Sequence, residues 1–317
     1  MKLWMRTLLI PFLVLSFACN RGQDSDRHQG PRIALVMKTL NNPFFISMQK
    51  GAEEAAERLG VNLIVQAAER EVDVEKQMQI IENLIQTRVD AICVAPSGSK
   101  EIIPAIAKAN EAGIPVLVVD TRVDAQAAKE AGIQIATFIG SDNYEGGRIA
   151  GEYLVQLFNG KAKVAILEGI PGHETGDARL RGFLYAIKDE PGIEVVASQP
   201  ANWERDQGFN VFQNILQAHP DVQALFACND MMALGAVEAI AAAGKTGEIV
   251  VIGFDAVEDA RKAIAEGKME ASVAQFPYEM GKTAVETAVK ILNGESVPDY
   301  IPVKIELIRK ENVEMAE

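Results

Sequence analysis

The sequence has few of the residues that build metal and redox centres. Its 317 residues include three cysteines and three histidines, and their spacing matches no zinc or thiol-redox motif. Cys93 and Cys228 both lie within apolar runs, where a free thiol usually packs as a small hydrophobic group. We therefore predict no metal site and no cofactor.

The sequence also lacks a basic excess and the common catalytic motifs. It has 31 Lys and Arg against 44 Asp and Glu, a formal net charge of −13. Because nucleic-acid binding needs Lys and Arg at phosphates, this charge argues against a nucleic-acid partner. We find no Gly-x-Ser-x-Gly, no P-loop, no dinucleotide fingerprint and no nucleophile–base pair, so we predict that the protein is not an enzyme.

Long hydrophobic runs are absent outside the first residues. Lys2 and Arg6 precede an apolar run at 8–15, which is too short for a permanent membrane span and is typical of a secretory signal. The following SFAC at 16–19 resembles a bacterial lipoprotein signal. We predict that residues 1–19 are a signal peptide with Cys19 as the lipidated first mature residue, although conventional cleavage without lipid stays open. Residues 20–31 are polar and read as a tether, so we expect a periplasmic or extracytoplasmic protein anchored to the membrane.

From residue 33 onward, short apolar runs alternate with amphipathic helical patterns. The first three runs begin 28 residues apart, at 33, 61 and 89, which is the length of one βα unit. The pattern predicts an α/β protein built from two halves with parallel sheets, and extra elements at 270–275, 280–292 and 301–307. The predicted strands are 33–37, 61–65, 89–95, 115–120 and 135–139 in the first half, and 163–167, 193–197, 222–227 and 249–254 in the second.

The stretch LNNPFF at 40–45 follows the first predicted strand. The carboxyl ends of strands are where open α/β sheets bind ligands. A nucleotide site would place glycines there, but Asn side chains donate to and accept from hydroxyls, and Phe rings cover C–H surfaces. The stretch is therefore compatible with a sugar site, although on its own a proline turn with both Phe rings packed in the core is the commoner arrangement.

Polar and aromatic side chains also follow other predicted strands. Asp120, Arg179, Trp203, Asn229 and Asp255 all occupy such positions. Taken singly, each could be a helix cap, a surface ion pair or a core residue. Taken together, they favour a sugar site, because carboxylates accept and guanidinium groups donate strong hydrogen bonds to hydroxyls.

Five motifs stand out along the chain: LNNPFF at 40–45, GSDN at 140–143, FACNDMMALG at 226–235, VIGFD at 251–255 and VAQ at 273–275. In combination they resemble those of bacterial periplasmic ribose-binding proteins. The resemblance runs from about Arg32 to the C-terminus and implies two Rossmann-like lobes with parallel sheets joined by a three-strand hinge, as in type I periplasmic binding proteins. Such proteins close on a monosaccharide and deliver it to the permease of an ATP-binding-cassette (ABC) importer.

The resemblance also implies where the lobes and the site lie. The N-terminal lobe would comprise residues 32–140 and 275–303, and the C-terminal lobe residues 141–274 and 304–317. The expected ligand-binding residues are Asn42, Phe44, Phe45, Asp120 and Gln275 from the first lobe, with Arg179, Trp203, Asn229, Phe254 and Asp255 from the second.

Two positions depart from the family pattern. Trp203 replaces a Phe, and Thr121 replaces a ligand-contacting Arg. Arg122 is adjacent, but a shift of one residue beyond a strand end should point it elsewhere. We expect the change at Thr121 to open space beside Asp120. One Arg against two Asp in the expected site predicts a neutral pentose or hexose, ribose or a related sugar.

Three other functions compete with import. A sugar-responsive repressor would need a DNA-reading helix-turn-helix where this chain has a secretory segment. A periplasmic enzyme would need catalytic groups that the sequence does not display. A sensor read by a membrane chemoreceptor or kinase fits the same fold and stays open. We expect the protein to be a monomer.

Overall fold

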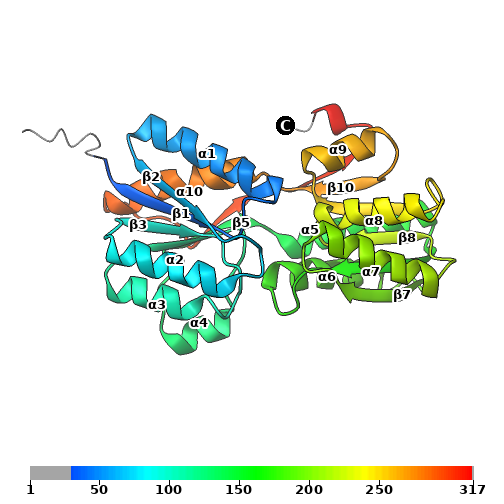
Figure 1. Ribbon diagram of the computed structural model, residues 1–317, viewed down its shortest axis with the longest axis horizontal. Helices are drawn as coiled ribbons and strands as arrows, with labels where there is room; N and C mark the ends of the chain where they lie inside the picture. Colours follow the sequence, from blue (N-terminus) through cyan, green and yellow to red (C-terminus); the bar gives the residue numbers. More distant parts are fainter. Residues whose placement is uncertain (1–29, 316–317) are drawn as a thin grey trace, which may run out of the picture.

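The computed structural model describes residues 30–315, which fold into two α/β lobes lying side by side (Figure 1). Each lobe is a six-stranded sheet with helices on both faces. The predicted fold class is therefore confirmed. Cys19 and the predicted signal and tether lie outside the described residues, apart from the last two positions of the tether. No helix among the described residues is long and apolar enough to span a membrane.

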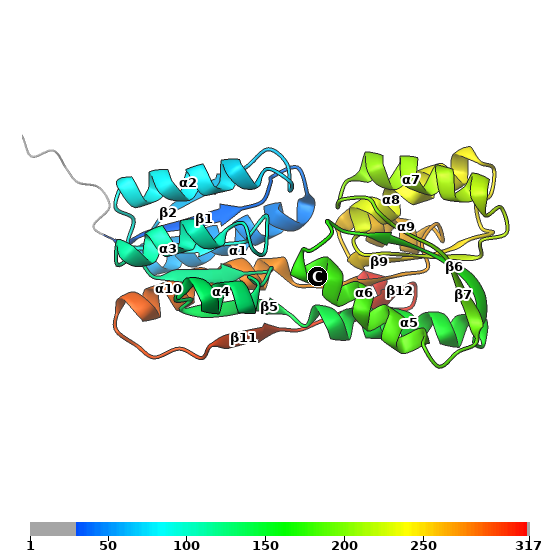
Figure 2. The same cartoon turned by 90° about the horizontal axis from the view of Figure 1, so that it is seen from below.

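The first lobe carries a sheet in which all neighbouring strands are parallel. Helices α1 and α10 cover one face and α2, α3 and α4 the other (Figures 1 and 2). Coverage of both faces explains why these strands read as continuous apolar runs rather than alternating ones. The strand order is β11 (Tyr300–Val303), β5 (Thr137–Ser141), β4 (Val116–Val119), β3 (Ala91–Val94), β1 (Arg32–Met37) and β2 (Asn62–Ala67); the helices are α1 (Pro43–Leu59), α2 (Val74–Gln86), α3 (Ile103–Glu111), α4 (Ala125–Ala131) and α10 (Pro277–Leu292).

The second lobe repeats this plan, with one edge strand reversed. Helices α5 and α6 cover one face, and α7, α8 and α9 the other (Figure 2). Strand β12 runs antiparallel to β10, whereas the other pairs are parallel. The strand order is β12 (Glu306–Arg309), β10 (Ala271–Ala274), β9 (Val250–Asp255), β8 (Ala224–Ala227), β6 (Lys161–Glu168) and β7 (Gly192–Pro200); the helices are α5 (Asn143–Phe158), α6 (Glu174–Ile187), α7 (Arg205–Ala218), α8 (Asp230–Ala242) and α9 (Glu258–Ala265), and a short 3-10 helix, η1 (Val313–Met315), follows β12.

The chain passes between the sheets three times: after β5, after β10, and between β11 and β12. The third passage divides the single element expected at 301–307. Its first part pairs with β5 in the first lobe, and its second part pairs with β10 in the second. A strand must leave one hydrogen-bonded ladder before it can enter another, so Lys304 and Ile305 between them belong to neither sheet.

Close packing of α5 against α6 depends on glycine. A Cβ on Gly147 of α5 would lie 2.0 Å from the carbonyl oxygen of Arg179, and one on Gly182 of α6 would lie 2.0 Å from that of Tyr144. Only residues without a side chain allow the two backbones to approach this closely. The approach sets the position of α6, and with it the direction of Arg179.

Candidate functional site

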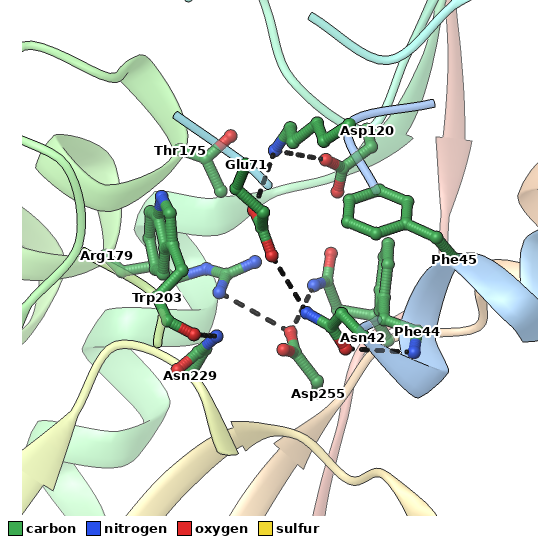
Figure 3. A pocket seen from close by; sticks show the side chains of 12 residues that line it. Asn42, Phe44, Phe45, Glu71, Asp120, Thr175, Arg179, Trp203, Asn229 and Asp255 are labelled. Atoms are coloured by element: carbon green, nitrogen blue, oxygen red, sulfur yellow. Dashed lines mark hydrogen bonds and ion pairs between the residues drawn. The ribbon is translucent and has the colours of Figure 1, made fainter. Parts of the chain in front are cut away.

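A small cavity that is partly open to solvent lies between the lobes, near the carboxyl ends of both sheets (Figure 3). Nine of the ten predicted site residues line it; the exception is Phe254. Three residues that the sequence analysis did not select also line it, namely Lys38, Glu71 and Thr175. The full lining is Lys38, Asn42, Phe44, Phe45, Glu71, Asp120, Thr175, Arg179, Trp203, Asn229, Asp255 and Gln275.

The LNNPFF stretch forms the start of α1. Asn42 is the N-cap, and its Oδ1 accepts a hydrogen bond from the Phe44 amide at 3.0 Å. Its Nδ2 donates to Glu71 Oε1 at 3.0 Å. The rings of Phe44 and Phe45 pack edge to face, with centroids 5.2 Å apart. Both rings are buried and both line the cavity, so the core role and the site role that the sequence left open apply together.

Lys38 is the central charge of the first lobe's side of the cavity. It follows β1 directly, and its Nζ lies 3.0 Å from Asp120 Oδ2 and 3.9 Å from Glu71 Oε2. All three residues are buried. The signal for Lys38 was present in the sequence, because it is a polar residue at the carboxyl end of a buried strand. Glu71 lies in the loop between β2 and α2, where no local pattern marks it.

Burial and charge act differently on the two carboxyls. Burial raises the pKa of Glu71 to about 7, against the opposing effects of Lys38 and the Asn42 amide. Burial also acts to raise the pKa of Asp120, but Lys38 and Arg179 outweigh it and hold that pKa below its ordinary value. At neutral pH Asp120 is therefore the ionised partner of Lys38, whereas Glu71 is close to its titration point.

The Glu71 pKa predicts a pH-dependent stability. A carboxyl whose pKa is raised from 4.5 to about 7 on folding stabilises the fold fully below pH 4.5, and this contribution is lost as the pH rises through 7. We expect the unfolding free energy of the wild type, relative to Glu71→Gln, to fall by about 3 kcal/mol over this range. Denaturant titrations of both proteins from pH 4.5 to 8 would measure it. Other titrating groups are common to both proteins and cancel, so parallel curves would contradict the assignment.

Arg179 and Asp255 form the corresponding pair in the second lobe. Arg179 Nε donates to Asn143 Oδ1 at 2.9 Å, its Nη1 donates to the carbonyl oxygen of Cys228 at 2.6 Å, and the same Nη1 lies 3.4 Å from Asp255 Oδ1. Phe254 lies beneath this guanidinium, whose central carbon is 3.8 Å from the ring centroid. Phe254 is fully buried and supports Arg179 rather than lining the cavity.

Three of the cavity residues adopt strained backbone conformations. Asp120, Trp203 and Asp255 have φ values of 63°, 69° and 106°, a region that residues with side chains seldom occupy. The turn after Asp255 is braced by Asp230, whose carboxylate accepts hydrogen bonds from the Val257 amide at 2.9 Å and from the Ser272 hydroxyl at 2.7 Å. Such strain is typical of binding sites, where the surrounding structure fixes a side chain in one direction.

The charges that line the cavity already have partners. Lys38 pairs with Asp120, and Arg179 pairs with Asp255. Asp255 also accepts a hydrogen bond from Gln275 Nε2 at 2.7 Å, which leaves Gln275 Oε1 as a buried acceptor without a partner among the described residues. A ligand with hydroxyl groups would satisfy this acceptor, whereas a charged ligand would have to break an existing pair.

The expectation that Thr121 opens space beside Asp120 is wrong. Lys38 Nζ occupies that side of the carboxylate. The Thr121 hydroxyl itself donates to Asp120 Oδ2 at 2.9 Å. Arg122 points elsewhere, as predicted: its guanidinium carbon lies 3.8 Å from the Phe138 ring centroid and 4.5 Å from that of Tyr300.

Comparison with known proteins identifies the family. Residues 33–296 match the model of the periplasmic binding protein domain. The chain belongs to this family. It is 42% identical to the ribose import binding protein RbsB of Escherichia coli over 279 residues, which cover 88% of this chain and 90% of that protein. It is 39% identical to the D-ribose/D-allose-binding protein of Pseudomonas aeruginosa, with coverage of 84% and 83%.

Solved structures give the same relationship. A periplasmic solute-binding protein of an ABC transporter from Actinobacillus succinogenes, with bound D-allose, superimposes with a TM-score of 0.85 at 42% identity, covering 90% of this chain and all of that one. The family membership inferred from the motifs is thus confirmed.

Among the described residues, no group of three or more His, Cys, Asp or Glu is arranged to hold a metal ion.

Proposed function

We propose that this protein is the substrate-binding component of a sugar ABC importer and closes its lobes on a neutral monosaccharide. The observation that carries the proposal is a small cavity between two lobes in which each charged pair is already balanced and one buried acceptor, Gln275 Oε1, is unsatisfied. The aromatic faces of Phe44, Phe45 and Trp203 would cover the C–H surfaces of the ring. D-Ribose and D-allose are the first candidates, because relatives at about 40% identity are named for them or hold them.

A thermal-shift panel tests the ligand class. It should include D-ribose, D-allose, myo-inositol, D-ribose 5-phosphate and an amino acid. At a concentration about 100-fold above its dissociation constant, the correct sugar should add about 2.7 kcal/mol to the unfolding free energy. We expect stabilisation by a neutral sugar and none by the phosphate, which would have to displace Asp120 or Asp255 from its cation. Stabilisation by the phosphate or the amino acid alone would refute the proposal.

We propose a monomer that acts in the periplasm, the location typical of this family. Its partner would be a membrane permease, to which the closed form delivers the sugar without any catalytic step. The alternative partner is a chemoreceptor or kinase that recognises the same closed form. Deleting the permease would abolish uptake in the first case and leave sugar sensing intact in the second.

We further propose that the protein is anchored through a lipid on Cys19, on the basis of SFAC at 16–19. Cys19→Ser should release the protein from the membrane fraction or leave its signal uncleaved, with sugar affinity unchanged. Fractionation and N-terminal analysis of the mature protein would measure both effects. Wild-type protein that is soluble and begins at another residue would contradict the anchor.

A further inference from the structure

Helix α6 is capped by a residue of the opposite lobe. Helices α5 and α8 are capped by the side chains of their own N-cap residues, Asp142 and Asn229. The N-cap residue of α6, His173, makes no such bond. Instead, the backbone amide of Glu174 donates to Ser99 Oγ of the first lobe at 3.0 Å. Because the first amides of a helix have no partner within it, this bond satisfies a donor that would otherwise depend on water.

The next residue of α6 makes a second contact between the lobes. Thr175 Oγ1 lies 3.0 Å from Thr121 Oγ1, and both side chains are buried. The Thr121 hydroxyl donates its single proton to Asp120, so in the bond between the two threonines Thr175 is the donor and Thr121 the acceptor. Thr121 therefore joins a cavity residue of one lobe to a helix of the other.

His173 completes a run of three consecutive contacts. Its Nε2 lies 3.3 Å from the carbonyl oxygen of Pro96 in the first lobe, and its ring packs edge to face on Trp203 with centroids 5.9 Å apart. Burial lowers the pKa of His173 to about 3, so the ring is neutral. Its protonated Nε2 can then donate a hydrogen bond to the carbonyl oxygen of Pro96. Four positions downstream of Thr175 on the same helix lies Arg179, which faces the cavity.

We propose that residues 173–175 form a latch that holds the lobes closed by contacts of their own, and that Thr121 is the residue that couples this latch to Asp120. Two of these bonds are made to Ser99 and Pro96, neither of which lines the cavity, so the closed form draws stability from a surface that a ligand does not touch. The latch sets the rate at which the lobes reopen and release the sugar. This inference rests on the proposed function in that the released ligand is the monosaccharide.

The rate of ligand release tests the latch. Ser99→Ala and Thr121→Val each remove one hydroxyl between the lobes. Each should raise the dissociation rate constant of the best monosaccharide from the panel about fivefold, the equivalent of one net hydrogen bond. The association rate constant should change by less than about twofold, because the ligand meets the open form, in which the latch is not made. Stopped-flow displacement would measure both constants.

Thr137→Val is the matched control. Thr137 is a buried threonine of the first lobe, and its hydroxyl donates to the carbonyl oxygen of Pro298 in the same lobe at 2.8 Å. The variant Thr137→Val should leave the dissociation rate constant of the sugar unchanged. Release rates in Ser99→Ala and Thr121→Val equal to that of the control would overturn the proposal. The double variant Thr121→Val/Thr175→Val should raise the dissociation rate constant by less than the product of the two single effects. Each single change leaves one buried hydroxyl unpaired, whereas the double change removes both.

A second measurement separates the latch from the identity of the ligand. In the ligand-free protein, hydrogen exchange of the Glu174 amide should be slower in the wild type than in Ser99→Ala, because the amide is protected only in the closed form. If no monosaccharide binds the wild type, the proposed function fails. The exchange rate of the Glu174 amide then tests the latch independently of any ligand. Equal exchange in both proteins would overturn it.

Discussion

Replacing Asp255 by Ala is expected to weaken monosaccharide binding by about 30- to 1000-fold, or roughly 2–4 kcal/mol. Asp255 is buried at the junction of the lobes, accepts a hydrogen bond from Gln275 and lies 3.4 Å from Arg179. Its removal takes a charged acceptor from the ligand and leaves the Arg179 guanidinium uncompensated in a closed cavity. Isothermal titration calorimetry with the best sugar of the panel would measure the loss.

Two further variants interpret that result. Asp221→Ala removes a carboxylate of the same lobe that is exposed and pairs only with Lys163 among the described contacts, and it should leave affinity unchanged. Asp255→Asn keeps an acceptor oxygen and removes the charge, so its loss should be smaller than that of Asp255→Ala. A folded Asp255→Ala protein with near-native affinity would refute the role of this residue in the site.

The change Lys38→Met should reduce sugar affinity at pH 8 by more than about a hundredfold, because removing one member of a buried ion pair costs about 3–5 kcal/mol. Lys38 lies between Asp120 and Glu71, and all three are buried. Without the ammonium group, closure would bring two carboxylates together with no counter-charge. One of them would have to take up a proton, so the defect should diminish at pH 5. Titration calorimetry at both pH values would measure it.

The double variant Lys38→Met/Glu71→Gln provides the control for charge. In this variant Asp120 is the one carboxylate left of the Lys38, Asp120 and Glu71 cluster. Part of the sugar affinity lost in Lys38→Met at pH 8 should therefore be restored. Lys100→Met removes an exposed lysine of the same lobe that lies 3.7 Å from Asp124, and it should have no effect. A loss of equal size at pH 5 and pH 8, without recovery in the double variant, would show that Lys38 acts by packing rather than by charge.

The ion pairs Lys38–Asp120 and Arg179–Asp255 change the electrostatic argument made from the sequence. One Arg against two Asp predicted a neutral ligand. The structure adds Lys38 and Glu71, but it also shows that each cation is engaged by a carboxylate. The conclusion therefore stands on different grounds: a charged ligand is disfavoured because both cations of the cavity already have carboxylate partners within the protein, not because few charges are present.

The sequence by itself determined the fold class and most of the cavity. Apolar runs at regular spacing specify buried parallel strands, and the carboxyl ends of such strands meet at one edge of a sheet. This local rule placed Asp120 and Asp255 directly after β4 and at the end of β9, and it placed LNNPFF at 40–45 after β1. These positions follow from periodicity, which depends on near neighbours in the chain.

Only the tertiary structure decided which of these side chains meet and what each one contacts. Lys38 meets Asp120 across 82 residues of sequence, and Glu71 reaches the cavity from a loop without a regular pattern. Phe254 on β9 lies behind Arg179 on α6, and this contact depends on how the helix packs on the sheet. Thr121 faces Thr175 only because three separate chain passages bring the lobes together. Such contacts depend on how the lobes pack, and no local pattern in the chain records them.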